Sequence, residues 1–248
     1  MLFGLILVGT VMLYRLARVE ARYRRELDRW LDLVTHELKT PLAGVRTLLQ
    51  SMALGRVPEE ERPRLLNLGR RNVERLEHLV QNILIRNRMR RRRLELRDER
   101  IGLGNFTSKL IEQRVTSGVA VHKPVLRADE EVVASADPDA LRVILDNLLD
   151  NAEKYGRGDK PVCVDVRVDA GAALVEIADS GQGIAKDDLE RIFHLYFRAG
   201  GDPGGDRGSG LGLAISRDLA ERMGGSLTAR SEGRGKGAIF SLRLRRNE

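Results

Sequence analysis

The segment from Asn147 to Tyr155 constrains the fold of this 248-residue chain more than any other part of it. Its polar residues recur at the spacing of one helix face, and they are Asn147, Asn151, Lys154 and Tyr155. The opposite face is apolar and carries Leu141, Ile144, Leu145, Leu148 and Ala152. Two amide oxygens and a lysine suit a magnesium-bridged phosphate chain, because Mg²⁺ takes oxygen ligands and keeps several waters. The segment predicts a ligand-binding helix; taken alone, it also fits a solvated amphipathic helix.

A second candidate site follows at the end of a predicted strand, residues 173–178. The strand runs into Asp-Ser-Gly-Gln-Gly, with a carboxylate at Asp179 and glycines at Gly181 and Gly183. A carboxylate in this place can accept a hydrogen bond from an exocyclic amine such as that of adenine. The glycines let the backbone approach a flat ligand, since no Cβ stands in the way. Alone, the pattern also fits an ordinary turn.

Glycines dominate the chain between residues 200 and 212. Their density favours a mobile loop. The sequence Gly-x-Gly-Leu-Gly that closes the loop predicts a turn opening a helix, whose N-terminal N–H groups favour anions. A Gly-x-Gly-x-x-Gly dinucleotide site does not fit, because the strand–turn–helix unit and its later acidic residue are missing. The sequence also has no Gly-x-x-x-x-Gly-Lys-[Ser/Thr] phosphate loop.

Taken in order, these features resemble the ATP-binding domain of bacterial sensor histidine kinases. The resemblance rests on the Asn-rich helix, Asp-x-Gly-x-Gly, the pair Phe193 and Phe197, residues 208–215 and the final Gly-Lys-Gly-Ala-Ile-Phe at 235–240. It implies an α/β sandwich with a mixed sheet, helices on one face, and ATP between the Asn-rich helix and a flexible lid. Related ATPase domains occur in a chaperone, type II topoisomerases, mismatch-repair proteins and serine kinases, so the N-terminal half must decide among them.

The resemblance also implies roles for the candidate residues. Asn151 is expected to be the magnesium ligand, Asn147 and Lys154 to contact phosphate, and Tyr155 to form a wall against the nucleotide. Asp179 is expected to hold the adenine amine.

The resemblance implies that two glycines of the Asp-x-Gly-x-Gly turn and a flexible lid also belong to the nucleotide site. Gly181 and Gly183 are expected to leave room for the base, and residues 199–209 to form the lid. The lid and its hinge are expected to contribute the remaining cofactor-binding residues Arg198, Gly208, Gly210, Leu211 and Gly212.

The N-terminal half contains a second motif of the same family. Residues 34–42, Val-Thr-His-Glu-Leu-Lys-Thr-Pro-Leu, match its histidine box almost residue for residue. A lone histidine on a helix is usually structural, but this context predicts that His36 is the phosphoacceptor. Neutral imidazole is a nitrogen nucleophile near neutral pH. Glu37 can orient the ring or accept its proton. Thr40 lies one turn further on, and the Glu-x-x-Thr pattern resembles that of members that also dephosphorylate their partner.

Apolar residues recur every three or four positions over residues 27–52 and again over residues 65–83. Between them, Gly-Arg-Val-Pro at 55–58 is a stop and turn signal. Two such helices cannot bury both stripes alone, so we expect a homodimeric four-helix bundle. The predicted fold class is therefore α plus α/β: a helical hairpin followed by an α/β sandwich.

Residues 2–14 are apolar and uncharged, and several arginines follow them. A membrane span needs about 20 residues, so this segment is short. A signal peptide is an alternative, but no cleavage site or basic start is present. The charge asymmetry predicts that the following residues are cytoplasmic. We expect residues 1–14 to be an anchor in the bacterial inner membrane; a soluble or interfacial helix is the alternative. A connecting helix and hairpin are expected at 15–94, and the catalytic domain at 95–248.

The formal charge of +7 comes largely from arginine, with a run at residues 88–93. Nucleic-acid binding is not expected, because an aromatic content of 4% supplies no stacking platform. A solvated helix end near an anionic membrane surface accounts better for the run. The single cysteine, Cys163, indicates a reducing compartment. The other histidines, His78, His122 and His194, have no partners at metal-ligand spacing and are interpreted as structural.

The sequence thus predicts a membrane-tethered, homodimeric sensor histidine kinase. It is expected to bind ATP with Mg²⁺, phosphorylate His36, and pass the phosphoryl group to an aspartate of a response regulator receiver domain. Two alternatives remain. One is a non-catalytic scaffold for which ATP is only a conformational ligand. The other is a serine kinase or ATP-driven clamp with the same nucleotide fold, which would not need residues 36–41.

Overall fold

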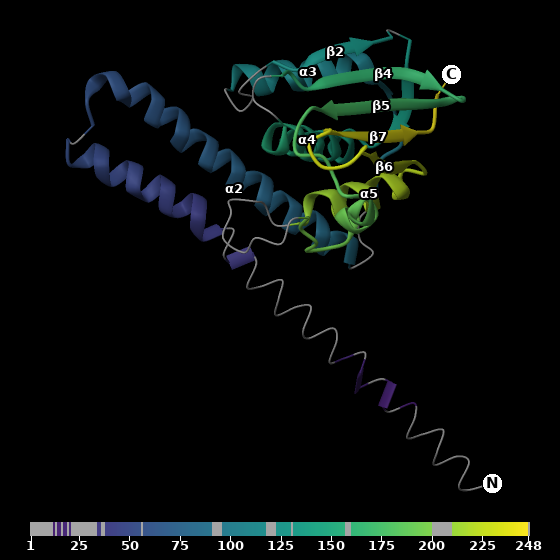
Figure 1. The fold of residues 1–248 in the computed structure, drawn as a ribbon, viewed down its shortest axis with the longest axis horizontal. Helices are drawn as coiled ribbons and strands as arrows, with labels where there is room; N and C mark the ends of the chain where they lie inside the picture. The colour runs from purple at the N-terminus through teal and green to yellow at the C-terminus, as the bar shows by residue number, and fades with distance from the viewer. Residues whose placement is uncertain are drawn as a thin grey trace, which may run out of the picture.

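The structure, a computed structural model, describes residues 12, 14, 15, 17, 18, 20, 34, 35, 38–55, 57–90, 96–117, 123–129, 131–156, 160–199 and 210–247. Within these residues a long helical hairpin precedes an α/β unit, and the second helix of the hairpin runs alongside that unit (Figure 1). This arrangement confirms the predicted fold class.

The hairpin consists of a helix over residues 38–53 and the helix α2 (Arg62–Arg90). The first helix ends at the predicted turn, where Gly55 adopts a φ of 64°. This left-handed conformation is favourable for glycine because it has no Cβ. Pro58 then precedes the 3₁₀ turn η1 (Glu59–Glu61), which leads directly into α2. The stop signal read from the sequence therefore lies where the chain reverses.

The α/β unit contains two sheets. Its elements are β1 (Glu99–Gly102), α3 (Leu103–Thr116), β2 (Val125–Ala128), β3 (Val133–Ala136), α4 (Pro138–Tyr155), β4 (Cys163–Asp169), β5 (Ala172–Asp179), η2 (Lys186–Asp188), η3 (Arg191–Phe193), α5 (Gly212–Arg222), β6 (Ser226–Arg230) and β7 (Ala238–Leu244). β1 and β3 form an antiparallel pair. The five-stranded sheet has the order β2-β4-β5-β7-β6, with β2 parallel to β4 and the other pairs antiparallel. The mixed sheet is as predicted.

The two faces of the large sheet differ in chemistry. Alternate residues of the central strands, such as Val175 and Leu242, are buried in one core with α3, α4 and α5. On the opposite face, Glu176 accepts hydrogen bonds from Arg167 (2.7 Å), Arg230 (2.9 Å) and Ser241 (2.8 Å). One face is therefore covered by helices and the other is polar, which is the expected two-layer sandwich.

The helix α4 forms where its sequence indicates. Asp137 caps its N-terminus by accepting a hydrogen bond from the Ala140 N–H at 2.9 Å, and Pro138 occupies the first turn. Its apolar residues Leu141, Ile144 and Leu148 are completely buried. Burial of each such side chain contributes about 1.5–3 kcal/mol, which fixes the rotation of the helix on the sheet. The polar face is therefore directed away from the core.

Several predictions concern the N-terminal residues. Of the expected anchor at 1–14, only Met12 and Tyr14 belong to the described residues. Among the described residues, no helix combines the length and apolar character that a membrane span requires. His36 and Glu37 also lie outside the described residues.

Candidate active site

The predicted ligand-binding face of α4 is present. Asn147, Asn151 and Tyr155 are half-buried along it, and Lys154 is exposed. The Lys154 ammonium lies 5.7 Å from the centroid of the Tyr155 ring. The two amides, the cation and the phenol therefore follow one another along one helix, as the sequence predicted.

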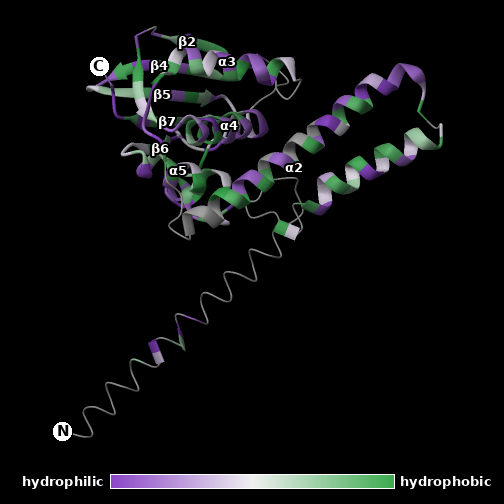
Figure 2. Cartoon of the chain, turned by 180° about the vertical axis from the view of Figure 1, so that it is seen from behind, coloured by the Kyte–Doolittle hydropathy of each residue, from purple (hydrophilic) through white to green (hydrophobic). Residues whose placement is uncertain are grey.

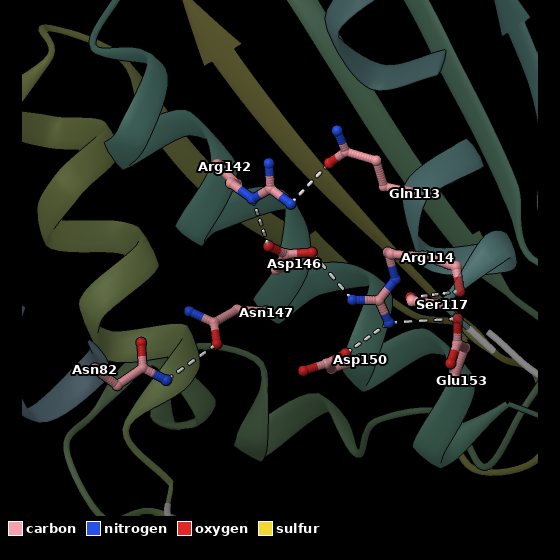
Figure 3. Close-up of polar contacts among 9 residues, drawn as sticks. All are labelled: Asn82, Gln113, Arg114, Ser117, Arg142, Asp146, Asn147, Asp150 and Glu153. Carbon is pink, nitrogen blue, oxygen red and sulfur yellow. Dashed lines mark hydrogen bonds and ion pairs between the residues drawn. The ribbon is translucent and has the colours of Figure 1, made fainter. Parts of the chain in front are cut away.

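Asn147 joins three helices at this site. Its amide nitrogen donates to the Gly212 carbonyl (3.3 Å) and to the Ser216 hydroxyl (3.1 Å) on α5. Its carbonyl oxygen accepts a hydrogen bond from Asn82 of α2 at 3.3 Å (Figure 3). A Cβ at Gly212 would lie 2.9 Å from that same oxygen, so the glycine permits the close approach of α5 to α4. Asn147 thus connects the Asn-rich helix with the glycine turn.

Asp179 lies at the end of β5, as predicted. Its Oδ1 accepts a hydrogen bond from the Gly181 N–H at 2.7 Å. Burial raises the pKa of the Asp179 carboxyl, although hydrogen bonds from the backbone of Gly181 and Ala238 oppose this shift. A partly buried carboxylate with an elevated pKa is typical of a ligand site.

The structure gives a different reason for the two glycines of this turn. A Cβ at Gly181 would lie closer than 3.0 Å to the carbonyl oxygen of Tyr155, and one at Gly183 would lie as close to the carbonyl oxygen of Gly233. Gly183 also has a φ of 64°. Backbone packing against α4 and the loop before β7 therefore requires the glycines. Their expected role in leaving room for the base stays a prediction.

The loop before β7 holds this turn through contacts that the sequence did not suggest. The Ser231 hydroxyl accepts a hydrogen bond from the Ile184 N–H at 3.0 Å and donates to the Gly237 carbonyl at 2.6 Å. The Gly237 N–H donates to the Gly181 carbonyl at 3.2 Å. No local pattern marks Ser231, because its partner in the Asp-x-Gly-x-Gly turn, Ile184, is 47 residues away in the sequence.

The residues on either side of the predicted lid are hydrogen-bonded to each other. The Tyr196 N–H donates to the Gly210 carbonyl at 3.0 Å, and Gly210 has a φ of 66°. Leu211 is completely buried, so the hinge is anchored in the core. Arg198 is half-buried at the first end of the lid. Gly208 and residues 200–209 lie outside the described residues.

In the predicted phosphoacceptor motif, the described residues include Thr40. It is exposed on the first hairpin helix, as is Lys39. The second hairpin helix, α2, reaches the α/β unit. It contacts α5, and its residue Ile85 packs against the core of the α/β unit. The hairpin and the candidate nucleotide site are therefore in direct contact.

The described residues are chemically suited to a magnesium-bound nucleotide. They supply an amide oxygen at Asn151, a cation at Lys154, a carboxylate at Asp179, and the first turn of α5 beside Asn147. Mg²⁺ is usually held by one or two protein oxygens together with phosphates and water. Within the described part of the chain, no group of three or more His, Cys, Asp or Glu side chains forms a separate metal site.

Comparison with protein families gives two matches. Residues 136–248 match the family described as "Histidine kinase-, DNA gyrase B-, and HSP90-like ATPase". Residues 26–92 match the family described as "His Kinase A (phospho-acceptor) domain".

The relatives with similar sequences are longer proteins than this chain. The aerobic respiration control sensor protein ArcB of Escherichia coli is 33% identical over 231 residues, which are 90% of this chain and 29% of that protein. The sensor protein kinase WalK of Staphylococcus aureus is 30% identical over 232 residues, which are 90% of this chain and 55% of that protein. The chain therefore spans less than two thirds of either relative.

Solved structures resemble the whole arrangement. The Acinetobacter baumannii histidine kinase AdeS has a TM-score of 0.59 and 25% identity, covering 86% of this chain and 98% of that one. Full-length ShkA in complex with AMPPNP has a TM-score of 0.59 and 25% identity, covering 88% of this chain and 46% of that one.

Proposed function

The chain belongs to the sensor histidine kinases of two-component systems, and from that premise we propose that it phosphorylates His36 from ATP and Mg²⁺. We further propose that the phosphoryl group passes to an aspartate of a response regulator receiver domain. The observation that carries the proposal is the link from Asn147 to Gly212 and Ser216, which joins the two nucleotide-binding motifs into one site.

Each residue has a distinct task in this proposal. Asn151 ligates magnesium, Lys154 contacts phosphate oxygens, and Asp179 accepts a hydrogen bond from the adenine amine. Asn147 contacts a phosphate oxygen by giving up one of its two N–H bonds, to Gly212 or to Ser216. Bound magnesium offsets charge on the phosphate oxygens. A ring nitrogen of His36 forms a bond to the γ-phosphorus as the bond to the β,γ-bridging oxygen breaks and ADP leaves. The ring proton goes to a base, for which Glu37 is the candidate.

The exposure of Thr40 favours a second activity, dephosphorylation of the regulator. A hydroxyl one turn beyond His36 can position a water molecule for attack on the phosphoaspartate. Replacing Thr40 with Ala should slow this dephosphorylation and spare phosphorylation of His36; an unchanged dephosphorylation rate would exclude the role.

The apolar surface of the hairpin supports a homodimer. Its helices carry apolar patches along their length (Figure 2), and the exposed residues include Leu42, Leu49, Leu66, Val73, Val80 and Leu84. A second copy can cover this surface in a four-helix bundle. A monomer mass in equilibrium sedimentation would refute this assembly.

We also propose a membrane tether at residues 1–14 and a domain boundary near residue 95. The tether rests on the apolar run before the arginines, which would leave the kinase domains in the cytoplasm. Recovery of the expressed chain in the soluble fraction would exclude the tether. The proposed boundary is supported by the end of α2 at Arg90 and the start of β1 at Glu99.

Phosphotransfer to histidine can be identified by the stability of the product. Purified chain incubated with γ-labelled ATP should acquire label that is labile in acid and stable in base. The label should move to a receiver domain that is added afterwards. Acid-stable label would favour the serine kinase alternative, and nucleotide binding without any label would favour the scaffold.

The pKa of Asp179 predicts a pH dependence of nucleotide binding. The ionised carboxylate accepts the adenine hydrogen bond more strongly than the protonated group does, and burial raises the pKa of Asp179. Affinity should therefore fall as the pH is lowered through that pKa, and the fall should begin above the ordinary aspartate value of about 3.9. Fluorescence titration with an ATP analogue will measure this.

Two variants test the assignment. Asp179→Asn should bind more weakly and lose this pH dependence, while Asp187→Asn, at an exposed carboxylate on η2, should retain the parent profile. An unchanged profile in Asp179→Asn would exclude the carboxylate as its source.

A further inference from the structure

Arg114 of α3 is almost completely buried against the polar side of α4. Its side chain is 5% exposed. Its guanidinium contacts Asp146 at 3.0 Å, Asp150 at 2.6 Å and Glu153 at 3.5 Å, so a single cation binds three carboxylates of one helix (Figure 3). Nothing in the proposed reaction uses these four residues.

The three carboxylates form a row beside the nucleotide face. Asp146, Asp150 and Glu153 each directly precede one of the residues Asn147, Asn151 and Lys154. Neighbouring residues of an α-helix lie about 100° apart around the axis, so the two rows occupy adjoining faces of α4, with Asn147 directed toward Asn82 and the carboxylates toward Arg114 (Figure 3). The acidic row is therefore next to the surface on which a triphosphate would bind.

We propose that Arg114 is a positioning residue for ATP, which holds α4 at a fixed rotation and offsets part of the negative charge beside the phosphate site. This inference rests on the proposed ATP binding. Without the guanidinium, three carboxylates would stand next to a ligand that is itself an anion. Like charges at such distances repel by an amount that depends on local solvent screening.

The geometry of the contact favours arginine over lysine. NH1 binds Asp146, whereas NH2 binds both Asp150 and Glu153. A planar fork of donors can serve several carboxylates at once, which a single ammonium group does less well. Burial alone would lower the pKa of the guanidinium, but the surrounding carboxylates outweigh burial and raise it, so the group stays charged.

Arg142 provides a matched control. It also joins α3 to α4, through Gln113 at 2.9 Å and Asp146 at 3.7 Å. Its side chain is 51% exposed, so solvent screens its charge. Removal of Arg142 should disturb the contact between the helices while Arg114 still neutralises part of the charge of the three carboxylates.

The test is fluorescence titration of the full chain with trinitrophenyl-ATP and magnesium, at low and high sodium chloride. The chain carries His36→Gln so that binding is measured without turnover. Arg114→Met should weaken binding about tenfold at low salt, and less at high salt because ions screen the repulsion. Arg114→Lys should lie in between, and Arg142→Met should stay within about twofold of the parent.

Two measurements separate charge from a merely structural contribution. Competition by adenosine, which has no phosphate, should change far less than ATP binding in Arg114→Met. Asp150→Asn, which removes one negative charge and keeps Arg114, should bind the probe as tightly as the parent or more tightly. A purely structural ion pair predicts weaker binding of both ligands and weaker binding by Asp150→Asn, and either result would overturn the inference.

Probe binding by Asp150→Asn still separates a charge effect from a structural one if Arg114→Met fails to fold. Failure of the parent chain to bind the probe would refute the proposed function itself. Normal binding by the parent with equal binding by a folded Arg114→Met chain would refute only the role of Arg114.

Discussion

Replacing His36 with Gln should abolish transfer of label from γ-labelled ATP to the chain while leaving nucleotide binding intact. Glutamine keeps a polar side chain of similar length but has no nucleophilic ring nitrogen, so no N–P bond can form. The proposed nucleotide site lies on α4, β5 and α5, and these elements do not contain residue 36. Label should therefore fall to background, and the affinity for an ATP analogue should stay within about twofold of the parent.

A matched control is available in the same hairpin. His78 lies on α2 and is outside the histidine box, so His78→Gln should retain label. Label that survives His36→Gln would place the acceptor elsewhere and would eliminate the proposed reaction. Simultaneous loss of label and of nucleotide binding would indicate a damaged fold, and thermal unfolding of each variant will detect that.

The features predicted successfully from the sequence were local ones. The apolar stripe of α4 was predicted from its spacing, and the structure buries it. The Asp137 cap was not predicted, although Asp-Pro at a helix start is also a local signal. The hairpin turn was visible because Gly55 and Pro58 punctuate two apolar repeats. The stripe and the turn both depend on residues that lie within one or two helical turns of each other. The periodicity of a sequence shows such local relationships directly.

Contacts between distant segments could not be predicted in the same way. Asn82 and Asn147 are 65 residues apart, and Arg114 is 32 to 39 residues from its carboxylate partners. Neither Asn82 nor Arg114 differs locally from an ordinary polar residue of a helix. Their partners depend on how α2 and α3 pack against α4, which no pattern within either helix specifies.

The glycines of the Asp-x-Gly-x-Gly turn show the same limit. The sequence predicted that Gly181 lets the backbone approach a flat ligand, and the structure adds a contact that was not predicted, with the backbone at the end of α4. The Gln182 N–H donates to the Tyr155 carbonyl at 2.9 Å, so this turn and the nucleotide helix are joined by their main chains. The Asp-x-Gly-x-Gly turn and the Asn-rich helix, which are separate motifs in the sequence, therefore form one structural unit.

Replacing Gly181 with Ala should consequently damage both stability and nucleotide binding. The added methyl group would lie closer than 3.0 Å to the Tyr155 carbonyl oxygen, which belongs to the backbone and cannot rotate away. Either the turn or the end of α4 must move. Overpacking of this kind costs about 1–3 kcal/mol, which lowers the melting temperature by about 2–12 °C for a domain of this size.

The same displacement should reach the nucleotide. Asp179, whose carboxylate is bonded to the Gly181 N–H, would shift relative to Asn151 and Lys154, and ATP-analogue affinity should fall at least about tenfold. Gly102→Ala is the matched control, because a Cβ at Gly102 meets nothing within 4 Å. It should leave both melting temperature and affinity nearly unchanged. A Gly181→Ala chain that is as stable and binds the ATP analogue as tightly as Gly102→Ala would show that the contact between the turn and α4 does not position the nucleotide site.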